Sequence, residues 1–536
     1  MPNASKKKEA ILPLLSLILL GLVVLHPFCH FHTPLATGDN GRDLYAFRQT
    51  LDGAMPYRDY YWVYGPLMPF YYALFMKILG ISIPSILAGQ ILLWLTSGVL
   101  MALILRKAGL GWLGWTAALW FWAFNPHFTY TYNHAGGVTC IMALVLLMFG
   151  YLRRPSRRYL FAAFLISLLL GLIKLNIGLA AMLAGIICVT LIDRANAANG
   201  RKNHAQLLIG GAIVITGLLG AVYFGLLHPL PVEVIRQCMP YLSPDRASHT
   251  SLPNALLLLV RHYIDPLLAV GPNLIFAFII YTAFLMVVTK LLKPEPDDPD
   301  RKTILFYLGI PFLFWFLLLH EFFLSAVPYR LFWITPLQTL LIFLILGLGF
   351  RSLKPAIRTL VGLALLAVVL LAHVSLHAYI RRFQVPGQFL PQERGQVYVA
   401  NPRDWVRTVN QTVEYIDREL LPHETFLALP YDPLYYYLCD RTSPTRQLFF
   451  YAYMHISPSQ EKEILKTLAT NNVRLILLSN RAHSQIPEVG TFGQTHLPML
   501  GKTIENDFTL IKTFGDWEKP GGAFKDHAIR IYQRQD

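Results

Sequence analysis

"GDNGRDLYAFRQTLDGAMPYRDYYWVYGPLMPFYYALF", residues Gly38–Phe75, places four aspartates and many tyrosines shortly after a strongly apolar segment. The aspartates are Asp39, Asp43, Asp52 and Asp59. The preceding segment is long enough to cross a membrane, because a helical span needs about 20 mainly apolar residues. The acidic stretch is therefore predicted to begin at a membrane boundary, where so many carboxylates need an explanation.

The composition of the whole chain indicates a polytopic α-helical membrane protein. Of the 536 residues, 54% are hydrophobic and only 14% are charged, and the mean hydropathy is +0.44. This balance is too apolar for a soluble domain of this size. We expect eleven transmembrane helices, each in a mainly apolar segment. The segments are Ala10–Phe28, Ile83–Leu105, Leu110–Asn125, Gly137–Leu152, Leu160–Ile173, Ile177–Ile192, Gln206–Leu227, Pro266–Val288, Thr303–Leu319, Leu331–Phe350 and Thr359–Tyr379.

The distribution of lysine and arginine predicts the orientation of these spans. With a cytoplasmic N-terminus, the inner loops carry most basic residues, for example Lys6–Lys8 and Arg153–Arg158, and the outer loops are poorer in them. The net charge of +15 is then a topology signal, and no nucleic-acid partner is predicted. We expect a multi-pass protein of a bacterial-type inner (plasma) membrane, whose first apolar segment is an uncleaved anchor.

Two domains are predicted from the change in composition along the chain. Residues 1–380 form the transmembrane domain, and residues 381–536 form a soluble α/β domain. Eleven crossings from a cytoplasmic start place this second domain in the periplasm or outside the cell. Its predicted strands are Thr425–Asp432, Val473–Asn480 and His527–Gln535, and its predicted helices are Trp405–Leu420 and Ser457–Asn471.

The first outer loop, residues 29–82, is predicted to hold two interfacial helices. Apolar residues recur at helical spacing in Asp43–Gly53, and Gly65–Gly80 is an apolar helix too short to span a membrane. Asp39 then lies just beyond the first span, and Asp43 lies one helical turn further on. Both carboxylates are expected at the outer membrane boundary, near lipid headgroups.

Two interpretations of these carboxylates stay open from the spacing. In the functional one, a carboxylate is a general base on an acceptor hydroxyl, or helps to hold a divalent metal ion, while a sugar is transferred. In the structural one, Asp39 or Asp43 caps a helix and forms salt bridges to Arg42 and Arg48.

Two basic residues are predicted at the same face of the membrane. Lys174 lies in a tight turn between two spans, and Arg330 lies at the outer entrance of another. Cations at that depth are costly unless a partner or a headgroup phosphate neutralises them. Snorkelling explains each residue alone. Together with the acidic loop, however, they favour a lipid phosphate bound beside a carboxylate site.

The common metal and nucleotide motifs are absent from the sequence. His127, His134, His320 and Glu321 lie in predicted outer loops without metal-ligand spacing, so hydrogen-bonding roles are favoured over a metal site. The five cysteines are isolated. No phosphate-binding glycine loop occurs. A transferase acting outside would therefore need its activated group delivered on a lipid, and a polyprenyl phosphate suits such a site.

These residues resemble the GT-C fold glycosyltransferases, the superfamily of protein O-mannosyltransferases and lipid A aminoarabinose transferase. In that family the first outer loop has an aspartate, often Asp-Glu, a helix ending in glycine, a Pro-Tyr-x-Asp segment and a proline-rich interfacial helix. Asp39 falls on the catalytic aspartate, and Gly53–Leu67 falls on the segment that follows. The second acidic position is occupied by Asn40, which Asp43 would replace.

The resemblance implies a GT-C-like fold and a glycosyltransferase that moves a hexosyl or pentosyl group by inverting displacement. The donor is a polyprenyl-phosphate sugar in the membrane lipid, and the acceptor is a cell-envelope glycan, lipid or protein. Asp39 and Asp43 would be catalytic, and Lys174 and Arg330 would bind the donor phosphate. A divalent metal cofactor stays an open possibility. Residues expected to bind the acceptor or shape the loop are Tyr57, Arg58, Asp59, Tyr64, His320 and Glu321.

A membrane transporter or flippase of lipid-linked or envelope substrates is the main alternative. A non-enzymatic assembly or sensor protein is a third. Few ionisable residues lie within the predicted spans, and no paired broken helices occur in two related halves, which favours the enzyme.

Overall fold

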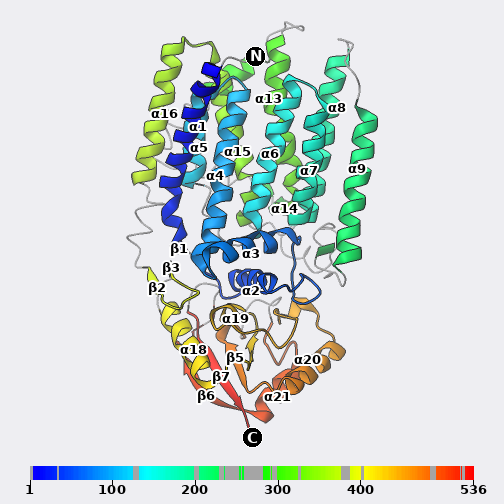
Figure 1. Cartoon of the computed structure of the whole chain (residues 1–536), viewed down its shortest axis with the longest axis vertical. Coiled ribbons are helices and arrows are strands. Elements are labelled where there is room, and N and C mark those ends of the chain that lie inside the picture. The colour runs from blue at the N-terminus through cyan, green and yellow to red at the C-terminus, as the bar shows by residue number, and fades with distance from the viewer. Residues whose placement is uncertain are drawn as a thin grey trace.

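The computed structural model describes residues 4–32, 35–124, 132–197, 204–227, 234–235, 253–254, 256–258, 282–289, 291, 299–323, 328–375, 387–399, 404–482, 490–519, 521 and 526–535. Three layers follow one another along the long axis of the molecule (Figure 1). A helix bundle lies at the end that holds the N-terminus, a layer of two short helices lies below it, and an α/β domain lies at the other end.

The helix bundle contains a helix for ten of the predicted spans. These helices are α1 (Ala4–Leu25), α4 (Ile83–Lys107), α5 (Gly114–Phe124), α6 (Asn133–Arg153), α7 (Arg157–Ile173), α8 (Leu175–Ala197), α9 (Ala205–Gly220), α13 (Pro299–Leu318), α15 (Thr335–Gly349) and α16 (Pro355–Ser375). Short turns connect or extend them, namely η1 (His26–Cys29), η2 (Gly111–Leu113), η3 (Ala221–Leu226), α14 (His320–Phe323), η5 (Pro328–Trp333) and η6 (Phe350–Ser352). The remaining predicted span, Pro266–Val288, lies mostly outside the described residues.

Five stretches of the described chain are long and apolar enough to cross a membrane. They are Ile83–Lys107, Asn133–Arg153, Leu175–Asn196, Gln206–Leu226 and Arg301–Phe323. Shorter apolar helices occur at Pro13–Leu25, Leu67–Leu79, Thr335–Gly349 and Pro355–Ala367. A helical membrane protein is therefore supported, and the total of eleven spans stays a prediction.

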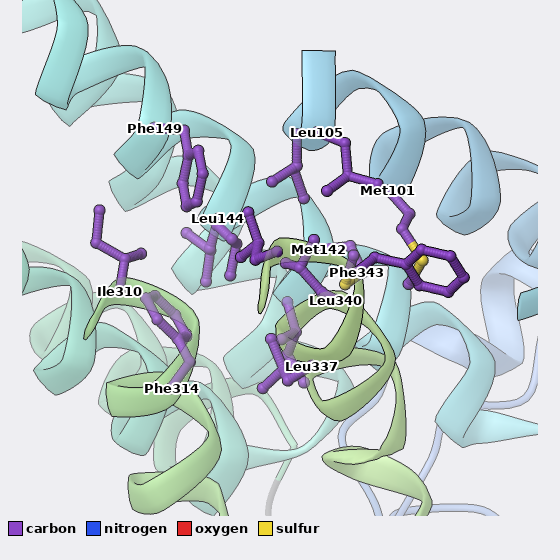
Figure 2. Close-up of a cluster of buried hydrophobic side chains, with 14 of the residues drawn as sticks. Met101, Leu105, Met142, Leu144, Phe149, Ile310, Phe314, Leu337, Leu340 and Phe343 are labelled. Carbon is purple, nitrogen blue, oxygen red and sulfur yellow. The ribbon is translucent and has the colours of Figure 1, made fainter. Parts of the chain in front are cut away.

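Large apolar side chains fill the centre of the bundle, where α4, α6, α13 and α15 meet (Figure 2). Lipid tails are as apolar as these side chains, so van der Waals packing contributes most of the stabilisation between helices. The packed core fixes the outer ends of the helices relative to one another. Residues labelled in this core include Met101, Leu105, Met142, Phe149, Phe314, Leu340 and Phe343.

The first outer loop forms the middle layer, with α2 (Asp39–Leu51) and α3 (Leu67–Leu79). Helix α3 lies across the end of the bundle and exposes Phe70, Leu74 and Ile78 at helical spacing, as expected of an interfacial helix. Helix α2 was expected at the membrane surface too, but it is buried between α3 and the C-terminal domain. The C-terminal domain covers the side of α2 that faces away from α3, and the sequence of the loop alone does not predict this contact.

The C-terminal α/β domain is built on a four-stranded sheet with the order β4-β5-β7-β6. Strands β4 (Phe426–Leu429) and β5 (Leu475–Ser479) are parallel, whereas β7 (Ile529–Arg534) is antiparallel to both β5 and β6 (Phe508–Phe514). Both parallel strands are buried along their length, which explains their continuous apolar sequences. The helices of this domain are α18 (Trp405–Glu419), α19 (Leu434–Leu438), α20 (Pro458–Thr470) and α21 (Pro498–Asp507).

All five predicted elements of this domain are present, and the predicted start of the second helix is confirmed by a capping box of Ser457 and Gln460. Helices α19 and α21 and strand β6 were not predicted. A separate small sheet joins the end of the first span to the C-terminal part. It contains β1 (Phe31–His32), β3 (Val397–Val399) and β2 (Gln388–Leu390).

Candidate functional site

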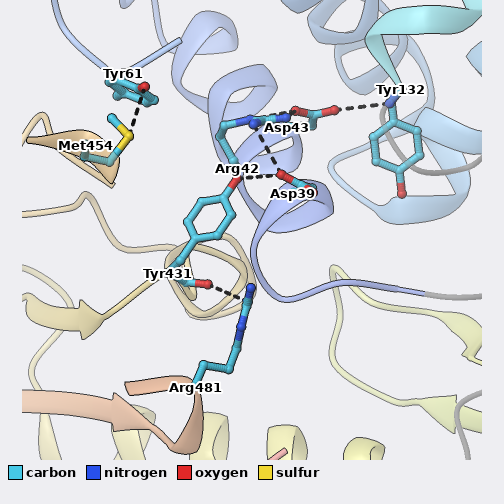
Figure 3. A network of polar contacts seen from close by, with 8 residues as sticks. All are labelled: Asp39, Arg42, Asp43, Tyr61, Tyr132, Tyr431, Met454 and Arg481. Atoms are coloured by element: carbon cyan, nitrogen blue, oxygen red, sulfur yellow. Dashed lines mark hydrogen bonds and ion pairs between the residues drawn. The ribbon is translucent and has the colours of Figure 1, made fainter. Parts of the chain in front are cut away.

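An acidic cluster lies at the start of α2. Gly38 occupies the N-cap position of this helix, and no side chain makes a capping hydrogen bond. Neither Asp39 nor Asp43 is therefore the N-cap. Asp39 Oδ1 accepts a hydrogen bond from the Tyr431 hydroxyl at 2.9 Å and lies 3.4 Å from Arg42 Nη1 (Figure 3). Asp43 Oδ1 accepts two hydrogen bonds from Arg42, at 2.8 and 3.1 Å. The two carboxylates therefore share one arginine.

The two carboxylates differ in burial. The side chain of Asp39 is 33% exposed, whereas that of Asp43 is 0% exposed. The second oxygen of Asp43 accepts the backbone N–H of Tyr132 at 3.1 Å. Burial raises the pKa of Asp43 to about 6, although Arg42 opposes this shift. Asp43 is therefore enclosed by its partners, and Asp39 is the carboxylate that a ligand can reach.

A basic cluster lies at the ends of the bundle helices that face the middle layer. Lys174 follows the last residue of α7 and directly precedes α8, as the predicted tight turn requires. Glu321 Oε1 accepts hydrogen bonds from Lys174 and, at 3.0 Å, from Arg330. Glu321 Oε2 accepts one from Asn176 at 2.9 Å, and Asn176 also donates to His320 at 3.0 Å. Glu321 thus joins the two cations, and His320 contacts this cluster through Asn176.

Tyr64 lies between the two clusters. The Arg42 guanidinium lies 5.1 Å from the centre of its ring, and the Lys174 ammonium lies 5.8 Å from it. The ring of His134 lies 5.1 Å from the same ring and is stacked on Phe332 at 4.7 Å. The fold therefore brings the first loop, the α7–α8 turn and the segment before α15 together around one tyrosine.

The remaining first-loop residues shape the loop. Tyr57 is fully buried and donates from its hydroxyl to the carbonyl of Tyr64. Asp59 accepts the Met55 N–H at 2.8 Å and pairs with exposed Arg58, and hydrogen bonds from Arg58 lower its pKa. These contacts are internal to the loop. The predicted salt bridges to Arg42 form, whereas Arg48 pairs with Asp52 and Asp440.

Two contributors to the site were not predicted from the sequence, and a third, His134, was predicted only as a hydrogen-bonding loop residue. Tyr431 comes from the end of β4, and Arg481 from the end of β5, both in the C-terminal domain. His134 has a buried Nδ1 with no hydrogen-bond partner among the described residues. Tyr431 lies near the end of the predicted strand Thr425–Asp432, and Arg481 directly follows the predicted strand Val473–Asn480; such positions are a signal for ligand sites in parallel sheets. His127 lies outside the described residues.

A divalent metal fits poorly on the described side chains. No group of three or more His, Cys, Asp or Glu residues in the described ranges could hold one. Both oxygens of Asp43 already accept hydrogen bonds, so the acidic cluster offers mainly Asp39. We therefore derive no chemical step through a metal ion.

The three layers and this site define a class, the membrane proteins with a GT-C-like fold. Among solved structures, the chain is similar to ArnT from Cupriavidus metallidurans. In the apo state the TM-score is 0.55, with 12% identity over 98% of each chain. With bound undecaprenyl phosphate the TM-score is 0.54, with 13% identity over 96% of this chain and 97% of that one.

A second similar structure is the Archaeoglobus fulgidus oligosaccharyltransferase in complex with Zn and sulfate. The TM-score is 0.54 and the identity 10%, over 95% of this chain and 73% of that one. No protein-family model and no curated protein matches the sequence. At these identities the likeness establishes the GT-C-like fold, and the activity has to be argued from the site.

Proposed function

We propose that this protein is an integral membrane glycosyltransferase that moves a sugar from a polyprenyl-phosphate donor to a cell-envelope acceptor. The transfer takes place at the outer face of the inner membrane, with a cytoplasmic N-terminus. ArnT, one of the similar structures, holds undecaprenyl phosphate, which supports a donor of this lipid class. The sugar is a hexosyl or pentosyl group, and the acceptor is a glycan, lipid or protein.

The observation that carries this proposal is the pair of oppositely charged clusters around Tyr64. An inverting transfer needs a group that takes the acceptor proton and a cation that stabilises the leaving phosphate. Asp39 is the reachable carboxylate of one cluster, and Arg330 and Lys174 are the cations of the other. The two clusters meet at Tyr64, whose ring is contacted by Arg42 of the acidic cluster and by Lys174 of the basic one.

The reaction follows from this arrangement. The acceptor oxygen attacks the anomeric carbon and forms the new C–O bond, while the bond from that carbon to the phosphate oxygen breaks. Asp39 takes the proton of the acceptor hydroxyl. The bonding electrons leave with the phosphate, whose negative charge Lys174 and Arg330 stabilise. Asp43 holds Arg42, which in turn orients Asp39.

The proposal is tested in cells that lack the protein, by mass spectrometry of envelope glycans and polyprenyl-linked lipids. We expect the polyprenyl-phosphate sugar to accumulate and one sugar to be lost from the envelope. The wild-type chain should restore that sugar, and Asp39→Asn should not. Full restoration by Asp39→Asn would favour a transporter or flippase instead, because transport does not need a general base.

A further inference from the structure

The carboxyl ends of β4 and β5 face the acidic cluster, and their chemistry is not used by the mechanism above. Adjacent parallel strands commonly bind ligands in the crevice beyond their carboxyl ends. Here the chain leaves β4 through Tyr431 and leaves β5 through Arg481. The C-terminal domain therefore lies against α2 with Tyr431 and Arg481 near Asp39, as Figures 1 and 3 show.

The contact between these strand ends and α2 is close. The backbone N–H of Leu434 donates to the Thr37 carbonyl at 3.1 Å. A Cβ atom added to Gly41 would lie 2.3 Å from the backbone nitrogen of Leu434, and one added to Gly38 would lie 2.5 Å from the Tyr431 ring and 3.1 Å from Arg481 Nη1. Arg481 therefore lies next to the residue that precedes Asp39.

Arg481 is held as a positive charge beside two aromatic rings. Its guanidinium lies 5.7 Å from the Tyr431 ring centre and 5.6 Å from that of Tyr451. It donates to the Tyr431 carbonyl at 3.1 Å, and among the described residues it forms no ion pair. Burial alone would lower the pKa of Arg481, but Tyr451 and the carboxylates of Asp432 and Asp39 raise it overall.

This arrangement suits an acidic saccharide. A guanidinium binds phosphate or carboxylate oxygens through a planar set of donors. Arg481 is half-buried and is the group of this cluster that a ligand reaches, whereas Tyr431 and Tyr451 are only 2% and 5% exposed and support it. The donor comes from the membrane side, where Lys174 and Arg330 lie, so the side of Asp39 that faces the C-terminal domain is left for the acceptor.

We propose that Arg481, held in place by Tyr431 and Tyr451, forms the acceptor subsite, and that it binds a saccharide carrying a phosphate or carboxylate near the attacking hydroxyl. This inference rests on the proposed glycosyltransferase function. Tyr431 is in addition a positioning residue, since its hydroxyl holds Asp39 at 2.9 Å. The acceptor is thereby brought to Asp39 by a domain that lies 392 positions further along the chain.

The experiment uses the purified full-length protein in detergent and three probes: glucose 6-phosphate, glucuronic acid and neutral glucose. We expect the wild-type chain to bind at least one acidic sugar more than tenfold more tightly than glucose. Arg481→Gln should lose that preference, and Arg481→Lys should keep part of it. Arg474→Gln is the matched control, because Arg474 lies exposed at the opposite end of β5. Thermal unfolding confirms that each variant is folded.

Equal binding of glucose and both acidic sugars would overturn the inference, as would an unchanged preference in folded Arg481→Gln, or no binding of any probe. Undecaprenyl phosphate is measured in parallel. Its affinity should be unchanged in Arg481→Gln and reduced in Lys174→Met. If the wild type binds acidic sugars but not undecaprenyl phosphate, the subsite stands and the proposed donor fails; the reverse result overturns the subsite alone.

Discussion

The two charged clusters beside Tyr64 are opposites in composition. In the acidic cluster, Asp39 and Asp43 share Arg42, which leaves one negative charge that Arg42 does not compensate. In the basic cluster, Lys174 and Arg330 both donate to Glu321. Each counter-ion reduces the cost of placing two like charges near the membrane. The site therefore joins a carboxylate-rich cluster to a cation-rich one through contacts to the same tyrosine ring.

Burial within each cluster separates the groups that can meet a ligand from those that hold them. The exposed fractions are 33% for Asp39 and 18% for Arg330, against 0% for Asp43, 4% for Lys174 and 2% for Glu321. We infer that Asp39 and Arg330 contact substrate first. Asp43 and Glu321 fix the geometry of the cations beside them.

The largest effect is expected from removing the uncompensated negative charge. In Asp39→Asn, sugar transfer in purified membranes should fall by about 100- to 10,000-fold, because a general base contributes about that much. Binding of undecaprenyl phosphate should stay near the wild-type value. Asp52→Asn, at the exposed end of the same helix, is the control and should transfer normally. Normal transfer by Asp39→Asn would show that Asp39 is not the general base.

The next effect concerns the shared counter-ion of the basic cluster. Glu321→Gln takes the Glu321 carboxylate from buried Lys174 and half-buried Arg330, and we expect a loss of about 3–5 kcal/mol in stability. Thermal unfolding in detergent measures it, with Glu419→Gln as the surface control, since exposed pairs contribute only about 0–1 kcal/mol. In folded Glu321→Gln, undecaprenyl phosphate should bind at least as tightly as in the wild type. Unchanged stability would show that Glu321 does not hold the pair.

A smaller effect is expected from the reachable cation. Arg330→Gln removes a charge-assisted hydrogen bond worth about 1.5–3 kcal/mol, so undecaprenyl phosphate should bind about 10- to 150-fold more weakly. Binding is measured by native mass spectrometry of the purified protein. Arg407→Gln removes an exposed arginine of the C-terminal domain and should bind normally. Equal affinities of the two variants for undecaprenyl phosphate would show that Arg330 does not bind the donor phosphate.

The smallest effect is the pH dependence of the acidic cluster. The pKa of Asp43 is about 6 in the folded protein, against an ordinary value of 3.8, so the folded state binds the proton more tightly. The free energy of unfolding should therefore decrease as pH rises from about 4 to about 6, and level off above it. Asp43→Asn should lose this slope in thermal unfolding measured across that range. The same slope in both proteins would assign it to other groups.

Local patterns in the sequence account for most of the architecture. Hydropathy located ten helices of the bundle, and the sequence pattern also located α3 and two helices of the C-terminal domain, α18 and α20. Lys174 was correctly placed at a turn between two helices, because that prediction needs only the lengths of its neighbours. The predicted position of α2 at the membrane surface was wrong. Helix α2 is buried partly by α19, a short helix that no repeating sequence pattern predicts.

The sequence by itself determined a membrane protein with an acidic first outer loop, basic residues near the same face and a C-terminal α/β domain. Tertiary structure alone decided that Asp43 is enclosed and Asp39 reachable, that Glu321 joins Lys174 to Arg330, and that Tyr431 meets Asp39. Hydropathy and helical spacing reflect neighbours a few residues apart. The partners of a charged side chain are set by packing between segments hundreds of residues apart, on which those patterns carry no information.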